Sequence, residues 1–396
     1  MAGDADRAPD ATVTNSPSEA ARIPTTDTTG VPAPPPQAKR RRRSPLRKAL
    51  SRYPGYVLLL LLHALISKLP LPVGCALARL LGSAAYWITP RLRRNTVENL
   101  TLAYGAEKSP AEIRAVARRV FQNLALIVVE WAIIGRWSPE KLRRKFPEVC
   151  AVLTRATAEI RARGKGAIGI TGHIGNWEIL SIIYAACTPG FLLPVANRIY
   201  FEKYQEFFHR LRTRCGAKLI YTDESPRKIV RAIQQGSVPA FLPDHEVRTN
   251  SGVFVEFFRR PTYTTTMPVQ LARKFEVPIF FCLLLRDGSG FKAFYPGLID
   301  VPSTDDEASD IRTGTQHWTR VLEEQIRLHP DQWSWIQPRW RSTPDRPRTK
   351  VRRWKKERAR GDPTPGDPTP GDPTLGDPTL GDPTQSGREQ GEEGGR

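Results

Sequence analysis

Short apolar runs alternate with helical patterns through the middle of the chain, and this alternation constrains the fold more than any other feature. The runs cover residues 167–171, 192–196, 238–242 and 277–285. Helical patterns lie around residue 179 and over residues 201–214, 225–235 and 264–274. Such an order is typical of a parallel sheet with helices on both faces. The sequence therefore predicts an α/β fold with a mixed, mostly parallel sheet flanked by helices.

Further helices are expected on either side of this core. Residues 110–134 have the apolar spacing of one long amphipathic helix, and residues 150–163 form a second. A last helix is predicted over residues 310–328.

Two apolar stretches, residues 56–66 and 73–89, precede these helices. Each is shorter than the roughly 20 residues that span a bilayer, and Pro70 and Pro72 interrupt the chain between them. Residues 39–52 carry eight basic and no acidic side chains, and residues 91–94 add three arginines after the second stretch. By the positive-inside rule, both ends should face the cytoplasm. We expect a helical hairpin that dips into one leaflet or lies on it.

The two ends of the chain differ in composition from its middle. Residues 1–38 are rich in Ala, Pro, Thr and Asp, and five tandem Gly-Asp-Pro-Thr-x units begin at Gly361. Neither has enough apolar side chains to form a core. The predicted organisation is a disordered region with a basic tract (1–52), a membrane-associating segment (53–90), a catalytic domain (91–343) and a basic stretch with a repeat tail (344–396).

The net charge of +20 has several interpretations. The basic tract 39–43 alone would suit a solvated linker, a nuclear-localisation signal or a nucleic-acid contact. Its position beside an apolar stretch favours a membrane surface, and we expect no nucleic-acid partner. Residues 346–360 carry nine basic side chains against one Glu, a balance suited to anionic headgroups or an acidic carrier protein. The five cysteines show no C-x2-C spacing, so reduced thiols are expected.

The segment from Gly169 to Glu178 carries the strongest chemical signal. His173 follows a strand-like run, precedes a helical pattern and lies between Gly172 and Gly175. Such a turn exposes a side chain at the carboxyl edge of a sheet, where open α/β proteins bind ligands. Glu178 is five residues further on, so it could hold one imidazole nitrogen while the other takes a proton from a hydroxyl. A histidine that caps the helix beside a surface glutamate is the alternative.

Ordered blocks of residues around this turn resemble those of the bacterial lipid A late acyltransferases, the lauroyl and myristoyl transferases of the lysophospholipid acyltransferase superfamily. The resemblance covers about residues 56–340. Its blocks are residues 93–100, 172–178, 210–212, 242–246, 252–258 with 264–266, and 329–335.

The resemblance implies a glycerolipid acyltransferase-like fold and a role for each matching residue. His173 would be the base and Glu178 its orienting partner. Arg210, or the near-equivalent Arg212, and Asp244 would serve substrate binding, with Asp244 orienting one of these arginines or the loop that carries it. Arg198 lies in a segment that lacks the proline many members carry after it, and it is a further candidate for binding substrate.

The predicted protein is an O-acyltransferase at the cytoplasmic face of the cell inner membrane. It would move a fatty acyl group from an acyl thioester, either acyl carrier protein or acyl-CoA, to a hydroxyl of a lipid A precursor in lipopolysaccharide biosynthesis. No cofactor is expected, and the spacing of His173, His245 and Glu246 does not resemble a zinc site. The alternatives are an acyltransferase for another glycerolipid or glycolipid, and a non-catalytic lipid-binding membrane protein of the same fold.

Overall fold

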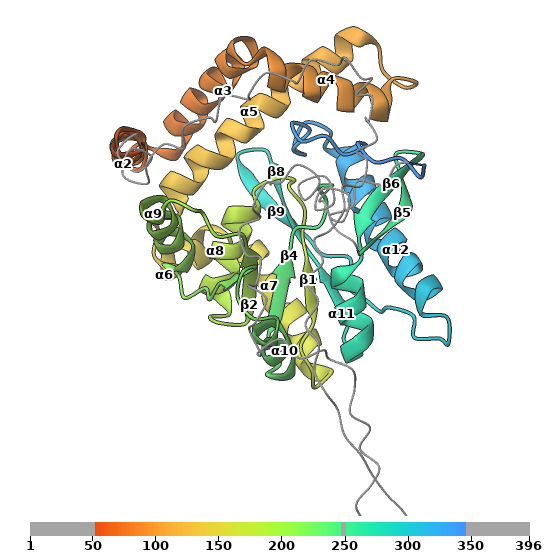
Figure 1. Cartoon of the computed structure of the whole chain (residues 1–396). Coiled ribbons are helices and arrows are strands. Elements are labelled where there is room, and N and C mark those ends of the chain that lie inside the picture. The colour runs from red at the N-terminus through yellow and green to blue at the C-terminus, as the bar shows by residue number, and fades with distance from the viewer. Residues whose placement is uncertain (1–51, 247–250, 346–396) are drawn as a thin grey trace, which may run out of the picture. The chain divides into compact units, whose positions relative to one another are not determined.

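The computed structural model describes residues 52–246 and 251–345. The predicted N-terminal region and the repeat tail lie outside these ranges. In the described part, a six-stranded sheet has the order β10-β7-β1-β4-β2-β3 (Figure 1). Its strands are β1 (Ile168–Ile170), β2 (Leu192–Ala196), β3 (Ile220–Tyr221), β4 (Val238–Phe241), β7 (Ile279–Phe281) and β10 (Leu298–Ile299).

The pairing of this sheet confirms the predicted fold class. Strand β1 pairs in parallel with both β4 and β7, and β2 pairs in parallel with β3 and β4. Only β10 runs antiparallel among the pairs described in this sheet, against β7. Two hairpins stand beside it: β5 (Gly252–Phe257) with β6 (Arg260–Thr265), and β8 (Leu283–Asp287) with β9 (Gly290–Phe294).

Alternate residues of the central strands build two cores, one on each face of the sheet. In β1, Ile168 and Ile170 join a core that includes residues of α11 (Met267–Phe275) and α12 (Glu307–Leu328). Ala240 and Phe280 face the opposite core with α7 (Pro147–Ala162) and α8 (Trp177–Cys187). A sheet covered on both faces needs apolar residues on both, which explains why its strands read as continuous apolar runs.

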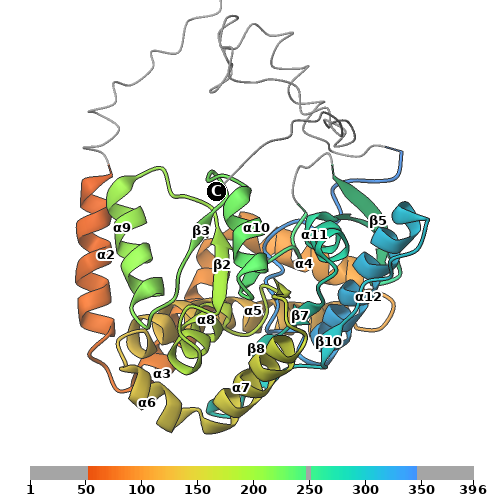
Figure 2. The same cartoon turned by 90° about the horizontal axis from the view of Figure 1, so that it is seen from below.

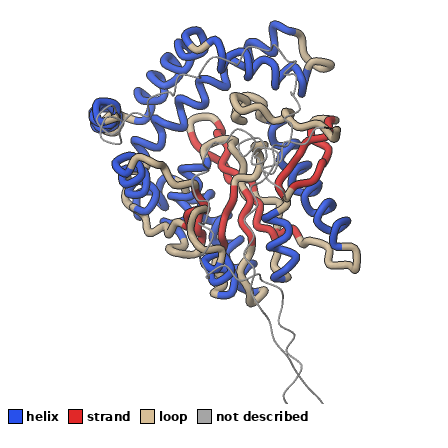
Figure 3. The backbone as a smooth tube through the Cα atoms, viewed as in Figure 1, coloured by secondary structure: helices blue, strands red, loops and turns tan. Residues whose placement is uncertain are grey.

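The remaining helices lie around the sheet and the helices that cover it (Figures 2 and 3). They are α2 (Tyr53–Ile66), α3 (Leu71–Ile88), α4 (Pro90–Tyr104), α5 (Pro110–Ile134), α6 (Pro139–Lys145), α9 (Glu202–Thr213) and α10 (Arg227–Gln234). The long helix α5 coincides with the predicted residues 110–134. It begins with a capping box in which Ser109 and Glu112 satisfy each other's backbone N–H groups.

Helix α3 packs along α5 through small side chains. Its buried residues are Gly74, Ala78, Gly82 and Tyr86, which recur every four positions and so share one face. A Cβ atom at Gly82 would lie 2.6 Å from the backbone of Phe121 and Gln122. Only glycine therefore allows the two helices to approach this closely.

Helices α2 and α3 expose many apolar side chains. No residue of α2 is buried, although its rings at Tyr53, Tyr56 and His63 contact α9 and the residue before it. Leu61, Leu65, Trp87 and Ile88 are each more than 60% exposed. By length and composition, α3 is the one helix in the described ranges that could cross a membrane.

Candidate active site

His173 lies in the turn between β1 and α8, at the carboxyl end of a central strand, as the sequence predicts. Two residues after His173, Gly175 and Asn176, fix the course of the turn. Asn176 caps α8 by accepting a hydrogen bond from the backbone N–H of Ile179. Gly175 has φ = +63°, and a Cβ atom there would lie 1.9 Å from the carbonyl oxygen of Leu284. Only glycine fits at this position.

Asp244 is the carboxylate that binds His173. Its Oδ1 lies 2.7 Å from His173 Nδ1, and its Oδ2 accepts a 2.7 Å hydrogen bond from the backbone N–H of His173. Trp333 Nε1 donates a third hydrogen bond, 2.8 Å long, to Oδ2. Strands β1 and β4 are parallel neighbours, so the residues three positions beyond each strand meet at the same sheet edge. The contact engages Nδ1 and leaves Nε2 as the nitrogen available to a substrate.

His245 stacks on the ring of His173. The ring centroids are 4.0 Å apart, and the planes differ by 7°. Trp177 closes another side of His173 with an edge contact at 4.9 Å. The His173 side chain nevertheless remains 24% exposed, whereas that of Asp244 is fully buried. An imidazole held by its neighbours and open to solvent on one side has the geometry that receiving a proton from a substrate would need.

The surroundings of this cluster shift its acid–base behaviour. Burial alone would raise the pKa of Asp244. The nearby imidazoles and the hydrogen bonds from His173 and Trp333 outweigh burial, and they hold this pKa below its usual value. Burial lowers the pKa of His245 to about 4, against the attraction of Asp244. Asp244 is therefore ionised and His245 neutral near pH 7.

A second buried network braces the same turn from α5 and β8. Asn176 donates a 2.8 Å hydrogen bond to Glu130, and Arg286 binds both carboxylate oxygens of Glu130 at 2.9 and 2.7 Å. Arg286 also donates to the carbonyl oxygen of Gly175 and to Asn123. The turn is thus tied to elements from distant parts of the sequence.

Glu178 does not make the contact that the sequence predicted for it. It lies in the first turn of α8, and its carboxylate accepts two hydrogen bonds from Arg212, through Nε at 2.9 Å and through Nη2. Because Asp244 occupies His173 Nδ1, the expectation that Glu178 holds this nitrogen is corrected here. The expectation that Asp244 orients an arginine is corrected in the same way, since its hydrogen-bond partners in the described part of the chain are His173 and Trp333.

The other predicted arginines lie apart from this cluster. Arg210 is 63% exposed and pairs with Glu206 on its own helix at 3.6 Å. Arg198 pairs with Asp223 at 2.8 Å and lies over the ring of Tyr221. Arg212 is only 24% exposed and contacts the motif at residues 172–178 through Glu178. Of the three, Arg212 is the one that the structure brings to the motif.

His173, Asp244 and His245 place possible metal-ligand atoms within 4.8 Å of one another. Their geometry does not suit a metal ion. A histidine binds a metal through the lone pair in its ring plane, and the lone pairs of two rings stacked at 7° do not converge on one ion. Both oxygens of Asp244 already engage His173, and Oδ2 also binds Trp333. The absence of a metal stays a prediction.

The sequence did not identify three residues of the site, because no motif or spacing distinguishes them. Glu130 and Arg286 are a helix glutamate and a strand arginine that meet only in the folded chain. Trp333 is 1% exposed, as a packing residue would be, and its indole N–H also binds Asp244.

Comparison with known proteins identifies the family of this chain. Residues 44–342 match the family described as bacterial lipid A biosynthesis acyltransferase. The chain belongs to this family. It is therefore an acyltransferase, and the sequence-level resemblance is confirmed.

Individual relatives of this acyltransferase are distant. The lipid A biosynthesis lauroyltransferase of Escherichia coli (strain K12) is 25% identical over 285 residues, which cover 71% of this chain and 89% of the relative. The palmitoleoyltransferase of the same strain is 22% identical over 280 residues, 70% of this chain and 88% of the relative. A phosphatidylinositol mannoside acyltransferase of Mycobacterium tuberculosis (strain CDC 1551 / Oshkosh) is 25% identical over 206 residues, 50% of this chain and 62% of that protein.

Proposed function

We propose that this acyltransferase moves a fatty acyl group from a thioester of acyl carrier protein to a hydroxyl of a lipid A precursor. The observation that carries the chemistry is the hydrogen bond between His173 Nδ1 and the buried, ionised Asp244. It holds the imidazole in one tautomer, with its Nε2 lone pair free. The names of the lauroyl and palmitoleoyl relatives support the choice of acceptor.

The reaction proceeds by direct transfer. His173 Nε2 takes the proton of the acceptor hydroxyl as its oxygen attacks the thioester carbonyl carbon. The new C–O bond forms, the C–S bond breaks, and the departing thiolate takes the proton from the imidazolium. Asp244 stabilises the imidazolium while the proton resides there. The carboxylate itself stays ionised throughout.

Arg212 is proposed to bind the acceptor or the developing oxyanion. Glu178 holds its Nε and Nη2, and Nη1 forms no hydrogen bond within the described ranges. A guanidinium held on one edge presents the other in a fixed direction, which suits phosphate or an oxyanion. Arg210 and Arg198 remain proposed substrate-binding residues outside this arrangement.

The protein is proposed to work at the cytoplasmic face of the inner membrane, with residues 53–90 as its lipid contact and residues 91–343 as the catalytic domain. The exposed apolar side chains of α2 and α3 support this location. Because α3 packs along α5 through its small residues, it lies along the protein surface and is better placed to rest in one leaflet than to cross the membrane.

Mass spectrometry of lipids from cells with and without the gene tests the acceptor. Lipid A that lacks one acyl chain in the deletion strain, restored by the wild-type gene but not by His173→Ala, is the expected result. A change confined to another glycolipid would instead select the alternative that the mannoside acyltransferase relative favours. In vitro transfer from matched carrier-protein and coenzyme A thioesters distinguishes the donors.

Variants of the exposed apolar surface test the location. Leu61→Glu with Trp87→Glu should release a large fraction of the protein from sedimented membranes. Leu328→Glu is the matched control, because Leu328 is 69% exposed at the end of α12, outside the proposed lipid contact. Equal release by both proteins would contradict the proposed surface.

A further inference from the structure

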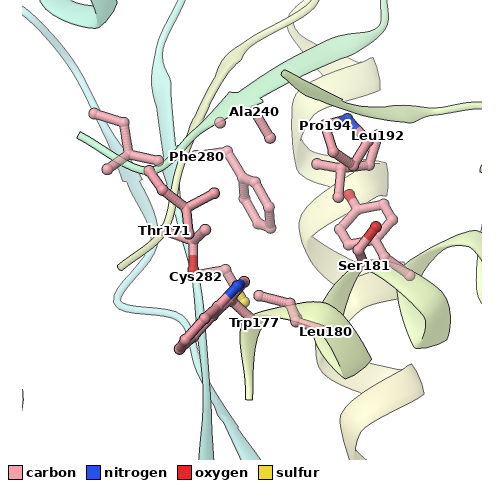
Figure 4. Close-up of a pocket in the computed structure, with 13 residues that line it drawn as sticks. Thr171, Trp177, Leu180, Ser181, Leu192, Pro194, Ala240, Phe280 and Cys282 are labelled. Atoms are coloured by element: carbon pink, nitrogen blue, oxygen red, sulfur yellow. The ribbon is translucent and has the colours of Figure 1, made fainter. Parts of the chain in front are cut away.

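Two cavities in the described part of the chain differ greatly in size. Figure 4 shows the smaller one, between α8 and the central sheet, where the side chains leave about 50 Å³, room for a few water molecules. The larger one measures about 590 Å³, which falls within the range of ligand sites. We call it the α6 cavity, because it lies where α6 meets the start of α3 and the tip of the hairpin of β8 and β9. Its lining includes Leu71, Trp137, Lys141, Lys145, Phe146 and Phe291.

Three packed aromatic rings line the α6 cavity. The rings of Trp137 and Phe146 stack with their centroids 6.0 Å apart, and Phe146 meets Phe291 edge-on at 5.8 Å. Trp137 precedes α6, Phe146 follows it, and Phe291 belongs to β9, so the rings join segments that are distant in the sequence. Tryptophan is enriched where proteins meet the boundary between lipid and water, because its ring is apolar and carries one polar N–H group. The rings therefore provide an apolar lining of a kind that is common at membrane interfaces.

Two lysines of α6 bring positive charge to this lining. Lys141 Nζ lies 4.5 Å from the centroid of the Trp137 ring, and Lys145 is exposed in the last turn of the helix. Neither ammonium group forms a salt bridge within the described ranges. Glu148 also lines the cavity, and it is exposed and likewise has no salt bridge there. Two ammonium groups against one carboxylate give the lining a net positive charge, which favours an anionic ligand.

The α6 cavity lies against the turn that joins α2 to α3 (Figure 2). Leu65, before this turn, is 65% exposed, and Val73, after it, is 53% exposed. Both belong to the proposed lipid contact. Arg136 holds the turn from the other side of Trp137 with a 2.9 Å hydrogen bond to Ser67 Oγ. If the apolar surface rests in one leaflet, a cavity at its edge lies at the depth of the lipid headgroups.

We propose that the α6 cavity binds the phosphate headgroup of an anionic phospholipid. Lys141 and Lys145 attract the phosphate, and the aromatic rings contact the apolar atoms next to it. An acidic protein would also have to cover the exposed Leu65 and Val73, whereas a lipid matches both the charge and these apolar surroundings.

This site is separate from the reacting groups. Arg143 fixes α6 to the C-terminal end of α8 through a 2.6 Å hydrogen bond to the Ala186 carbonyl, whereas His173 precedes the N-terminal end of α8. The occupant is therefore a lipid of the surrounding membrane and not the acceptor. The inference rests on the proposed membrane location, and it holds whichever lipid accepts the acyl group.

Co-sedimentation of the full-length protein with vesicles tests the site. Phosphatidylcholine vesicles with and without phosphatidylglycerol are compared at the same salt concentration. Lys141→Gln with Lys145→Gln should weaken binding to the anionic vesicles by about tenfold or more, because each basic residue close to anionic lipid strengthens binding severalfold. Binding to the neutral vesicles should not change, since the apolar surface of α2 and α3 is intact.

Arg144→Gln with Lys292→Gln is the matched control. These exposed side chains are neighbours of the lining in the sequence, carry the same total charge and do not line the cavity. Their loss should weaken binding by less than about threefold, because salt screens charges that lie outside a site. Urea denaturation should show that both double variants fold as the wild type does.

Equal weakening by the two double variants would assign the effect to general surface charge and overturn the proposal. Displacement of the protein from anionic vesicles by inorganic phosphate, but not by chloride at equal ionic strength, would assign the cavity to free phosphate and overturn the lipid assignment. Loss of binding to acyl carrier protein in Lys141→Gln with Lys145→Gln, with vesicle binding unchanged, would make it a protein site. A wild type that sediments with neither kind of vesicle would contradict the proposed membrane location itself.

Discussion

The turn that carries His173 is held between two buried carboxylates that have different kinds of partner. Asp244 binds the ring Nδ1 and the backbone N–H of His173. Glu130 binds the guanidinium of Arg286, which stays charged, and the side-chain amide of Asn176. In the proposed mechanism the first pair takes part in proton transfer, and the second pair holds the turn in position. The two pairs would then differ in role although they hold the same turn.

The sharpest test of this division is the loss of the imidazole. His173→Ala should lower turnover by at least about 10² to 10⁴, the range attributed to general-base catalysis. The free energy of unfolding should change little by comparison, because the ring is partly exposed. Single-turnover kinetics with urea denaturation gives both quantities. Near-normal transfer by the purified variant would exclude His173 as the base.

Glu130→Gln should have the opposite effect: a large loss in the free energy of unfolding, with no direct loss of proton transfer. Removing one partner of a buried ion pair costs about 3–5 kcal/mol, because Arg286 keeps an uncompensated charge. Urea denaturation measures this loss. Glu140→Gln is the control, since the Glu140 side chain is 73% exposed and its salt bridge in the described structure is to Arg143 on the same short helix, and we expect no measurable change there. A stable Glu130→Gln protein would show that the brace is not needed.

Asp244→Asn should affect catalysis and stability unequally. The amide cannot accept hydrogen bonds from His173 and Trp333 as the carboxylate does, so turnover should fall by about 10² or more. The unsatisfied groups should cost about 1–3 kcal/mol in the free energy of unfolding. Measuring turnover and the free energy of unfolding for both Asp244→Asn and Glu130→Gln allows the two carboxylates to be compared directly. If both variants lost stability and activity in the same proportion, the division would fail.

Arginine variants extend the comparison to the acceptor. Arg212→Lys removes the two-pronged contact with Glu178 and should raise the acceptor KM about tenfold. Arg210→Lys should have a smaller effect, since Arg210 is mostly exposed. Initial rates over a series of acceptor concentrations separate these effects. Unchanged KM with collapsed turnover in Arg212→Lys would assign the guanidinium to the transition state instead.

The effect of His245 on stability appears only in acid. The pKa of this buried ring is lowered to about 4 from an unfolded value near 6.5, so the folded state resists protonation between these values. The wild type should therefore lose up to about 3 kcal/mol of stability as the pH falls through this window, at about 1.4 kcal/mol per unit. His245→Gln should lose less over the same range. Identical acid sensitivity in urea titrations at pH 7 and pH 5 would contradict this.

Regular elements were largely predictable because local patterns set them. The bounds of α5 and β2 agree with the predicted residues 110–134 and 192–196. The run 277–285 reads as one strand in the sequence but breaks into β7 and β8 at Cys282, since the chain leaves the main sheet there to form a hairpin with β9. Apolar composition alone does not show which neighbour a strand will pair with.

The hairpin of β5 and β6 was missed because its turn carries the wrong residues for the usual signal. Phe258 and Arg259 both have positive φ, a conformation that normally favours Asn or Gly in two-residue turns. At the site, His173 was found from its place between a strand and a helix. Its partnership with Asp244 depends on the parallel pairing of β1 and β4, which are about 70 residues apart in the chain, and spacing cannot show this.

Helix α5 carries both α3, with its exposed apolar side chains, and the brace of the turn at His173. Its 25 residues form one uninterrupted rod, roughly 37 Å long, that is packed against Gly82 on one side and bonded through Glu130 to Asn176 on the other. No hinge separates the two contacts within this helix. If α3 rests in the leaflet, the unbroken helix α5 sets the height of His173 above the lipid surface. We expect the enzyme to select among hydroxyls by their depth in the bilayer as well as by their chemistry.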